Sequence, residues 1–368
     1  MVSARIAGGI LTIDLAALVA NWQHLADLAA PARAAAVVKA DAYGIGARQA
    51  IPALAKAGCR TFCVATIGEG IAARALTPDA EILILNGLMA DTEREFRDHD
   101  LTPVLNDPAE IEAWGRAARE RDQRWPAAIH LDTGMTRLGL DERAVERLIE
   151  QPDLLAGIDL RYWLSHLVAA EEADDTRCQA QLARFGDWQG RLKPANASLA
   201  NSSGIFRGGA FHLDLVRPGV ALHGANPTPG QPNPMRQVVQ LQGRILQVRD
   251  VDRPLTVGYG AAHAVPGPGR IATVAVGYAD GYFRTLGGRG FGVLAGHRVP
   301  VVGRVSMDTL SLDVSDVPPE ASRRGALVDL IGGGVDLDEL AGLAGTIAYE
   351  LLTALGRRFH REYLGGAG

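Results

Sequence analysis

The sequence has few cysteines, few aromatic residues and no long apolar run. Its 368 residues include 3 Cys, an odd number that is too small for a disulfide scaffold, and Cys59 and Cys63 have no second ligand pair for a zinc site. Charged residues interrupt every stretch of about 20 residues, the length that a transmembrane helix needs. We therefore expect buried thiols in a reducing compartment, no metal centre and no membrane-spanning segment.

Positive charge is not in excess either. Lys and Arg number 37 against 42 Asp and Glu, which gives a net charge of −5 without a basic tract. This balance argues against binding to nucleic acid or to an anionic membrane surface. The first residues lack the apolar core and cleavage site of a signal peptide. Because hydrophobic residues make up 47% of the chain, we expect a soluble, cytoplasmic globular protein with a sizeable core.

Short apolar runs alternate with helical patterns over the first two thirds of the chain. About eight such strand–helix units predict a parallel sheet that closes into a TIM-like (β/α)8 barrel over residues 8–232. An open doubly wound sheet is the alternative, and we favour the barrel because no Gly-x-Gly-x-x-Gly opens the first unit. Asp14 is predicted to cap the first helix. The predicted strands are 34–38, 61–65, 81–85, 102–105, 127–131, 159–165, 195–200 and 213–216, and the clearest helices are 108–121, 142–150 and 175–190.

The pattern changes at residues 226–234, where Pro, Gly and Asn cluster without periodicity and predict a linker. Beyond the linker, strand-type runs follow one another without helices between them, and one closing helix is predicted over residues 337–358. The sequence therefore predicts a mostly-β domain over residues 233–368, with residues 1–7 as a candidate addition to it. The strands predicted for this domain are 240–249, 255–258, 270–276, 299–305 and 310–314.

In a parallel barrel, reactive side chains stand at the carboxyl ends of the strands. Lys39 directly follows the first predicted strand, and burial at the barrel mouth would lower the pKa of its amine. Such an amine is a candidate nucleophile that forms an imine with a carbonyl group. The alternative for an isolated lysine is a side chain that reaches into solvent.

Further motifs follow the later strands. Arg137 lies in a glycine-containing loop after the fifth run, where a guanidinium suits a carboxylate or phenolate oxygen, and His166 ends the sixth run. Ser202 follows the seventh run and Gly219 the eighth, which are the positions of the recurring phosphate site of such barrels. Taken singly, Ser202 is more typical of a helix cap, Gly219 of a turn and His166 of a core histidine. Their common placement with Lys39 indicates a phosphorylated cofactor bound as an imine, and pyridoxal 5′-phosphate is the leading candidate.

Several of these segments match one known family. The most specific is Val-Val-Lys-Ala-Asp-Ala-Tyr-Gly-Ile-Gly at residues 37–46, supported by Asp-Thr-Gly-Met at 132–135 and Val-Arg-Pro-Gly at 216–219. Residues 277–281 and 303–308 match in the second domain, which argues against the smaller, barrel-only relatives. Over nearly its whole length the sequence resembles the alanine racemases, pyridoxal-phosphate enzymes of fold type III with an N-terminal barrel and a C-terminal β domain.

The resemblance implies an enzyme that interconverts L-alanine and D-alanine and supplies D-alanine for peptidoglycan. Removal of the α-proton from one face and its return on the other is economical with two bases, and the family implies Lys39, which also holds the cofactor, and Tyr259. A phenol is a poor base near neutrality unless its pKa is lowered, to which Arg137 nearby, or His166 through a hydrogen-bond relay, would contribute. Arg217 is implied to face the pyridine nitrogen of the cofactor. A permanent cation there disfavours ring protonation and should suppress transamination.

The remaining roles are also implied by the resemblance. Arg137 would contact the phenolate oxygen of the cofactor and the carboxylate of the substrate, and His166 would support Arg217. In the family the C-terminal domain reaches the barrel of a partner, which implies a homodimer with two composite sites. The implied cofactor contacts are Lys39, Tyr43, Arg137, His166, Asn201, Ser202, Arg217, Gly219, Val220 and Tyr349. The implied substrate contacts are Arg137, Met307 (through its backbone amide), Tyr278 and Asp308.

His130 departs from the family pattern, because many relatives carry a carbamylated lysine there that orients the arginine. An anion such as chloride, or His130 itself, is left to brace Arg137. Three competing functions are a racemase with broader or serine preference, a non-catalytic pyridoxal-phosphate carrier and a fold-type III decarboxylase. Tyr349 resembles the residue associated with alanine preference, while Tyr259 argues against a carrier. The acidic ring-nitrogen partner of the decarboxylases is absent.

Overall fold

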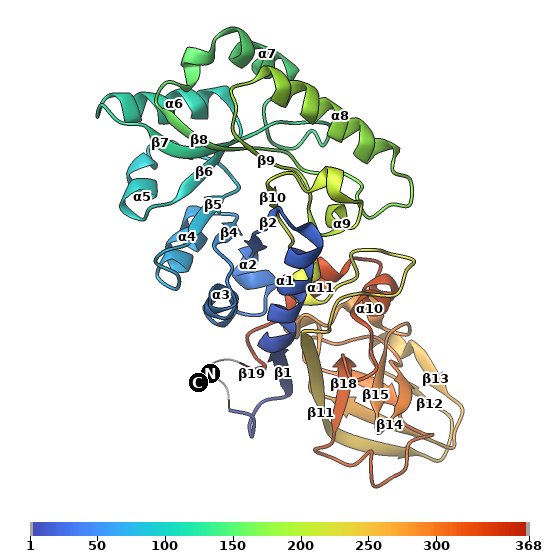
Figure 1. Cartoon of the computed structure of the whole chain (residues 1–368). Coiled ribbons are helices and arrows are strands. Elements are labelled where there is room, and N and C mark those ends of the chain that lie inside the picture. The colour runs from blue at the N-terminus through green and yellow to red at the C-terminus, as the bar shows by residue number, and fades with distance from the viewer. Residues whose placement is uncertain (1–2, 366–368) are drawn as a thin grey trace.

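The structure is a computed structural model that describes residues 3–365, and in this range eight parallel strands close into a barrel that is followed by a β domain. Residues 1–2 and 366–368 of the two predicted domains lie outside the described range. Figure 1 shows the barrel with its surrounding helices in blue to yellow-green, and the β domain beside it in yellow to red. The predicted fold class, a (β/α)8 barrel followed by a mostly-β domain, is confirmed.

Hydrogen bonds between the last strand and the first close the barrel. Strands β3 to β9 form a parallel sheet in chain order, and β10 pairs with β2, which leads directly into β3. Ala35 N donates to Val216 O (2.9 Å), while Arg217 N donates to Ala200 O (2.9 Å) on the opposite side of β10. All the carboxyl ends therefore meet at one rim. The barrel strands are β2 (Arg33–Ala34), β3 (Ala36–Val37), β4 (Thr61–Val64), β5 (Glu81–Ile84), β6 (Thr102–Leu105), β7 (Trp125–His130), β8 (Ile158–Leu164), β9 (Asn196–Ser198) and β10 (Leu215–Val216).

Helices surround the barrel, and several of them begin at a residue whose side chain caps the helix. The Asp14 carboxylate accepts a hydrogen bond from Ala17 N (2.9 Å) at the start of α1, as predicted, and Asp107 and Asp141 cap α6 and α7 in the same way. The three clearest predicted helices are confirmed as α6, α7 and α8. Within residues 3–365 no helix is long and apolar enough to cross a membrane. The helices are α1 (Leu15–Ala29), α3 (Ala47–Lys56), α4 (Ile67–Arg74), α5 (Glu93–Asp98), α6 (Pro108–Arg119), α7 (Glu142–Glu150), α8 (Thr176–Arg191) and α9 (Ser202–Ile205), with 3-10 turns η1 (Pro152–Leu155), η2 (Gly209–Phe211) and η3 (Val220–His223).

The β domain is built on the long strand β11. The main sheet has the order β16-β15-β18-β11-β1-β19, and β14 pairs with both β11 and β17. Strand β1 runs antiparallel to β11 and parallel to β19. The strands are β1 (Gly9–Asp14), β11 (Val239–Val251), β12 (Leu255–Val257), β13 (His263–Val265), β14 (Gly269–Val274), β15 (Phe291–Leu294), β16 (His297–Pro300), β17 (Leu310–Asp313), β18 (Leu327–Ile331) and β19 (His360–Leu364), with turns η4 (Tyr259–Ala261), η5 (Tyr278–Asp280) and η6 (Arg284–Leu286).

The structure differs from the sequence prediction in this second half. The single helix predicted over residues 337–358 is wrong, because Gly345 adopts φ +76° and separates α10 (Leu337–Ala344) from α11 (Ala348–Ala354). The strand predicted over 299–305 ends at Pro300 instead. Strands β13, β15, β18 and β19 are additional. Residues 9–14, which the sequence assigns to the barrel, form strand β1 in the sheet of the β domain.

Strand β1 anchors the two domains to each other. Its side chains alternate, and Leu11 and Ile13 are fully buried in a hydrophobic core that continues from the barrel into the β domain. Asp14 ends the strand and at once caps helix α1 of the barrel. The first secondary-structure elements of the chain therefore tie the barrel to a sheet whose other strands come from the last third.

We predict that Leu11→Ala lowers the free energy of unfolding by about 2–5 kcal/mol, because it leaves a cavity in this shared core. Leu364→Ala is the matched control, since Leu364 lies on β19 of the same sheet and is 51% exposed. Urea titration followed by circular dichroism measures both changes. An equal effect of the two substitutions would contradict the anchoring role of β1.

Candidate active site

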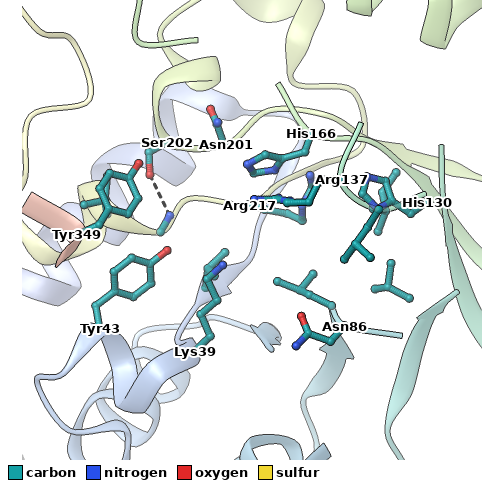
Figure 2. A pocket seen from close by; sticks show the side chains of 17 residues that line it. Lys39, Tyr43, Asn86, His130, Arg137, His166, Asn201, Ser202, Arg217 and Tyr349 are labelled. Carbon is teal, nitrogen blue, oxygen red and sulfur yellow. Dashed lines mark hydrogen bonds between the residues drawn. The ribbon is translucent and has the colours of Figure 1, made fainter. Parts of the chain in front are cut away.

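A cavity of about 410 Å³ opens at the carboxyl rim of the barrel, within the volume range of small-molecule sites. In Figure 2, Ser202, Tyr43 and Tyr349 lie at one end, Arg137 and His130 lie at the other, and Lys39 and Arg217 stand between them. Ten residues predicted from the sequence line this one cavity. They are Lys39, Tyr43, Arg137, His166, Asn201, Ser202, Arg217, Gly219, Val220 and Tyr349.

Lys39 begins a strained turn. The segment labelled α2 (Lys39–Tyr43) is not a right-handed helix, because Ala40, Asp41, Ala42 and Tyr43 all have φ between +53° and +54°. Left-handed backbone costs about 1–2 kcal/mol for each such residue. Hydrogen bonds hold the turn in place: Ala40 N donates to Glu69 Oε1 (2.7 Å), and Ala42 N donates to Val38 O (2.9 Å). The turn fixes Lys39 and Tyr43 on the same side of the cavity, and such strain is typical of functional sites.

The amine of Lys39 is less basic than an ordinary lysine. Burial lowers its pKa, and the positive charge of Arg137 lowers it further, against a smaller opposing effect of Glu69. The neutral amine, which is the nucleophilic form, is therefore more populated near neutral pH.

Ser202 and the turn η3 form a cradle of hydrogen-bond donors at one end of the cavity. The Ser202 hydroxyl oxygen accepts hydrogen bonds from Gly219 N (2.9 Å) and Ala221 N (3.2 Å), so α9 and η3 begin side by side. Gly219 is required there, because an added Cβ would collide with the Tyr43 hydroxyl. Tyr43 stacks on His223 (ring centroids 4.5 Å apart), and burial raises the pKa of the Tyr43 phenol, which keeps it a neutral donor. The first turns of α9 and η3, together with the hydroxyls of Ser202 and Tyr43, suit an anion such as a phosphate.

Arg217 is a buried cation that has no acidic partner among residues 3–365. It is 5% exposed, and its guanidinium donates to the Ser198 hydroxyl and the Ser165 carbonyl. Burial lowers its pKa to about 10, so it stays charged at neutral pH. Burial, together with the nearby charge of Arg217, holds the pKa of His166 well below its ordinary value, and this imidazole is therefore neutral.

His130 is held by Asn106 at the opposite end of the cavity. Both N–H groups of the Asn106 amide donate to carbonyls, those of Leu85 (3.2 Å) and Val104 (2.8 Å), so its oxygen accepts from His130 Nδ1 (2.8 Å). Burial, and then Arg217, lowers the pKa of His130 to about 4. The ring is therefore a neutral Nδ1–H tautomer that leaves Nε2 as an acceptor toward the cavity.

The loop that carries Arg137 is rigid at its start. The Asp132 carboxylate accepts hydrogen bonds from the backbone amides of Gly134 (3.0 Å), Met135 (2.9 Å) and Thr136 (3.0 Å). A hydrogen bond from Leu140 N to His130 O (2.8 Å) closes the loop. Arg137 itself stands exposed at the mouth of the cavity.

Of the predicted residues of the β domain, Tyr349 lines the cavity of its own chain, whereas Tyr259, Tyr278, Met307 and Asp308 do not. Tyr259 is 72% exposed on η4, and Tyr278 and Met307 are 41% and 54% exposed. Tyr278 and Met307 lie on adjoining loops, since Ala279 N donates to Met307 O (3.0 Å). Arg358 joins the same loops through ion pairs with Asp308 (2.6 Å) and Asp280 (2.6 Å). The exposed side chains of Tyr259, Tyr278 and Met307 are thus not among the residues that line the barrel cavity of the same chain.

Asn86 lines the cavity but was missed by the sequence analysis. It lies two residues after the end of strand β5. The same argument that selected Lys39, a position just past a strand end, could therefore have selected Asn86. The other unpredicted lining residues are apolar, apart from His130. Within residues 3–365 no cluster of His, Cys, Asp or Glu is arranged to hold a metal ion.

The fold and the site define a class of two-domain barrel proteins with a buried amine and an anion cradle at the barrel mouth. The family model of the alanine racemase N-terminal domain matches residues 13–227, and that of the C-terminal domain matches residues 238–363. The chain therefore belongs to the alanine racemase family.

Individual relatives match over nearly their whole length. An alanine racemase of Rhodospirillum rubrum is 50% identical over 361 residues, covering 98% of this chain and 96% of that protein. One of Methylobacterium sp. (strain 4-46) is 51% identical over 357 residues, covering 97% and 98%. The crystal structure of alanine racemase from Bartonella henselae with covalently bound pyridoxal phosphate has a TM-score of 0.94 and 40% identity, covering 97% of this chain and 100% of that chain.

We predict that Gly219→Ala lowers the free energy of unfolding by about 1–3 kcal/mol, because the new methyl group overpacks against the Tyr43 hydroxyl. Adding Tyr43→Phe removes that hydroxyl and should restore part of the loss. Gly186→Ala on α8 is the control, since nothing lies within 4 Å of its added Cβ, and alanine favours a helix there. Chemical denaturation measures these three variants and Tyr43→Phe alone. Equal losses with and without the Tyr43 hydroxyl would show that the collision is not the cause.

Proposed function

We propose that this protein is an alanine racemase that interconverts L-alanine and D-alanine with pyridoxal 5′-phosphate as its cofactor. The observation that carries the proposal is the convergence of Lys39, the Ser202–Gly219 cradle and Arg217 on one cavity of a chain from this family. In the cell, the protein would act in the cytoplasm and supply D-alanine for peptidoglycan.

The residues of the cavity fit this cofactor. Lys39, with its lowered pKa, would attach to the aldehyde, while Ser202 and the amides of Gly219 and Val220 would hold the phosphate. Tyr43, a neutral donor next to Gly219, would add to the phosphate shell together with Asn201 and Tyr349. When bound, pyridoxal phosphate supplies an electron-withdrawing ring that acidifies the α-carbon of an attached amino acid.

Arg217 sets the reaction that follows. We propose that its guanidinium faces the ring nitrogen, supported by His166, which is neutral for the reasons given above. A permanent cation beside that nitrogen would disfavour its protonation, and an unprotonated ring would hold the negative charge that develops near the α-carbon only weakly. Rapid return of the proton is therefore favoured over transamination.

Two bases are proposed for the proton transfers. Lys39 would act on one face of the α-carbon, and Tyr259 from a partner subunit would act on the other. The exposure of Tyr259 outside the cavity of its own chain supports action across a homodimer. Arg137 would bind the substrate carboxylate, and Tyr278, Met307 and Asp308 of the β domain would complete the approach to the site. Tyr349, which lines the cavity, supports alanine over the larger serine.

The first test is chiral analysis of L-alanine and L-serine incubated with the purified protein, with and without pyridoxal phosphate. We expect rapid racemisation of alanine by the loaded protein only, and weaker turnover of serine. Lys39→Ala should lose both the activity and the visible absorbance that borohydride abolishes in the wild type, because no amine remains to hold the cofactor. Retention of that absorbance by the variant would refute the role of Lys39.

The second test addresses Tyr259. Tyr259→Phe should abolish solvent deuterium exchange at the α-carbon of one alanine enantiomer and retain it for the other. If Tyr259 acts across the dimer, mixing Lys39→Ala and Tyr259→Phe subunits should restore about a quarter of the wild-type activity, since half of the dimers are mixed and one of the two sites in each is complete. Activity that stays at the level of the separate variants would place Tyr259 in its own chain's site or outside catalysis.

A further inference from the structure

Arg217 depends on neutral neighbours for its position. The Ser198 hydroxyl donates its proton to Leu215 O (2.5 Å), which leaves the oxygen to accept from the Arg217 guanidinium. The second acceptor is the backbone carbonyl of Ser165, at the end of β8. No carboxylate of residues 3–365 pairs with the guanidinium. The positions of these two oxygens therefore determine where it lies. What fixes Ser165 therefore also fixes Arg217.

A buried chain of hydrogen bonds leads from Ser165 to helix α8. The hydroxyls of Ser165 and Thr133 are 2.7 Å apart, and Gln181 Nε2 donates to Thr133 Oγ1 (3.0 Å). Ser165, Thr133 and Gln181 are 1%, 4% and 3% exposed, so water does not replace a lost partner easily. Thr133 belongs to the loop that carries Arg137. The chain of bonds thus connects the Arg137 loop to the backbone that holds Arg217.

Gln181 makes two more bonds to the same region. Its second N–H donates to His166 O (2.9 Å), and its oxygen accepts from Val168 N (2.9 Å). Both donors and the acceptor of the amide are therefore used, and its orientation is fixed. One side chain outside the barrel holds the strand ends that carry Arg137, His166 and, through Ser165, Arg217.

We propose that Gln181 is a positioning residue for the cation cluster of the active site, acting through Thr133 and Ser165. This inference rests on the proposed function, because it concerns the placement of Arg217 and Arg137 toward the cofactor and substrate. Gln181 does not line the cavity, so it acts on the reaction only through these neighbours.

The test uses Gln181→Met, which keeps the length of the side chain and removes its hydrogen bonds, and Thr133→Val, which removes the hydroxyl. Each should lower kcat/KM for alanine about 10-fold to 100-fold through misplacement of the arginines. Each should also raise the dissociation constant of pyridoxal phosphate for the apo-protein, by about 5-fold to 10-fold, which fluorescence titration measures. Thr133→Ser, which retains the hydroxyl, should restore both values.

Gln179→Met is the matched control, because Gln179 lies on α8 about half a turn away and is exposed. Among the described residues, its side chain hydrogen-bonds only to the Asp175 carboxylate (2.6 Å). It should leave cofactor affinity and turnover unchanged. The double variant Gln181→Met with Thr133→Val should lose no more than the worse single variant, since both interrupt one chain of bonds. The proposal would be overturned if the fold-losses of the two single variants multiplied in the double variant. It would also be overturned if the single variants lowered only the unfolding temperature and kept normal cofactor affinity and turnover. A wild type without racemase activity would instead refute the proposed function.

Discussion

The active site depends on a buried charge for which the described part of the chain provides no counter-ion. The Arg217 guanidinium is bound by a hydroxyl and a carbonyl on two neighbouring strand ends. Burial of an unpaired charge is costly, and only a rigid set of dipoles offsets the cost. The closed barrel provides that set, because its strand ends meet at one rim. The uncompensated positive charge also acts on its surroundings: it helps to keep His166 and His130 neutral, and it leaves the cavity attractive to anions.

Backbone strain complements this charge. The left-handed turn after Lys39 uses alanine, aspartate and tyrosine, none of which favours that conformation as glycine does. The turn is stable because Glu69, the capping residue of α4, also binds its first amide. As a result, Lys39 and Tyr43 are held by the packing of two helical segments rather than by local preference. The amine and the cradle keep a fixed separation.

The residues of the site were largely predictable, whereas their supports were not. Lys39, Ser202 and Gly219 stand within a few residues of the ends of strands whose apolar runs are plain in the sequence, so a barrel rim brings them together. Gln181 and Ser198 carry no such signal, because a buried polar residue on a helix or strand looks like a surface residue until its partners are known. Strand β1 was missed for a related reason: its partner β11 begins more than two hundred residues later, and no local pattern reports that pairing. The prediction of one helix over 337–358 was wrong at Gly345, because the apolar periodicity continues past this residue although its backbone is left-handed and ends α10.

Strand β1 also has a consequence for how the chain is made. It is synthesised before its neighbours β11 and β19, which lie more than 200 residues further along the chain. During synthesis the nascent barrel can form while this segment exposes unpaired edges and two leucine-sized apolar side chains. The sheet around β1 is complete only once β19 has been made, so the β domain closes after the barrel strands have been synthesised.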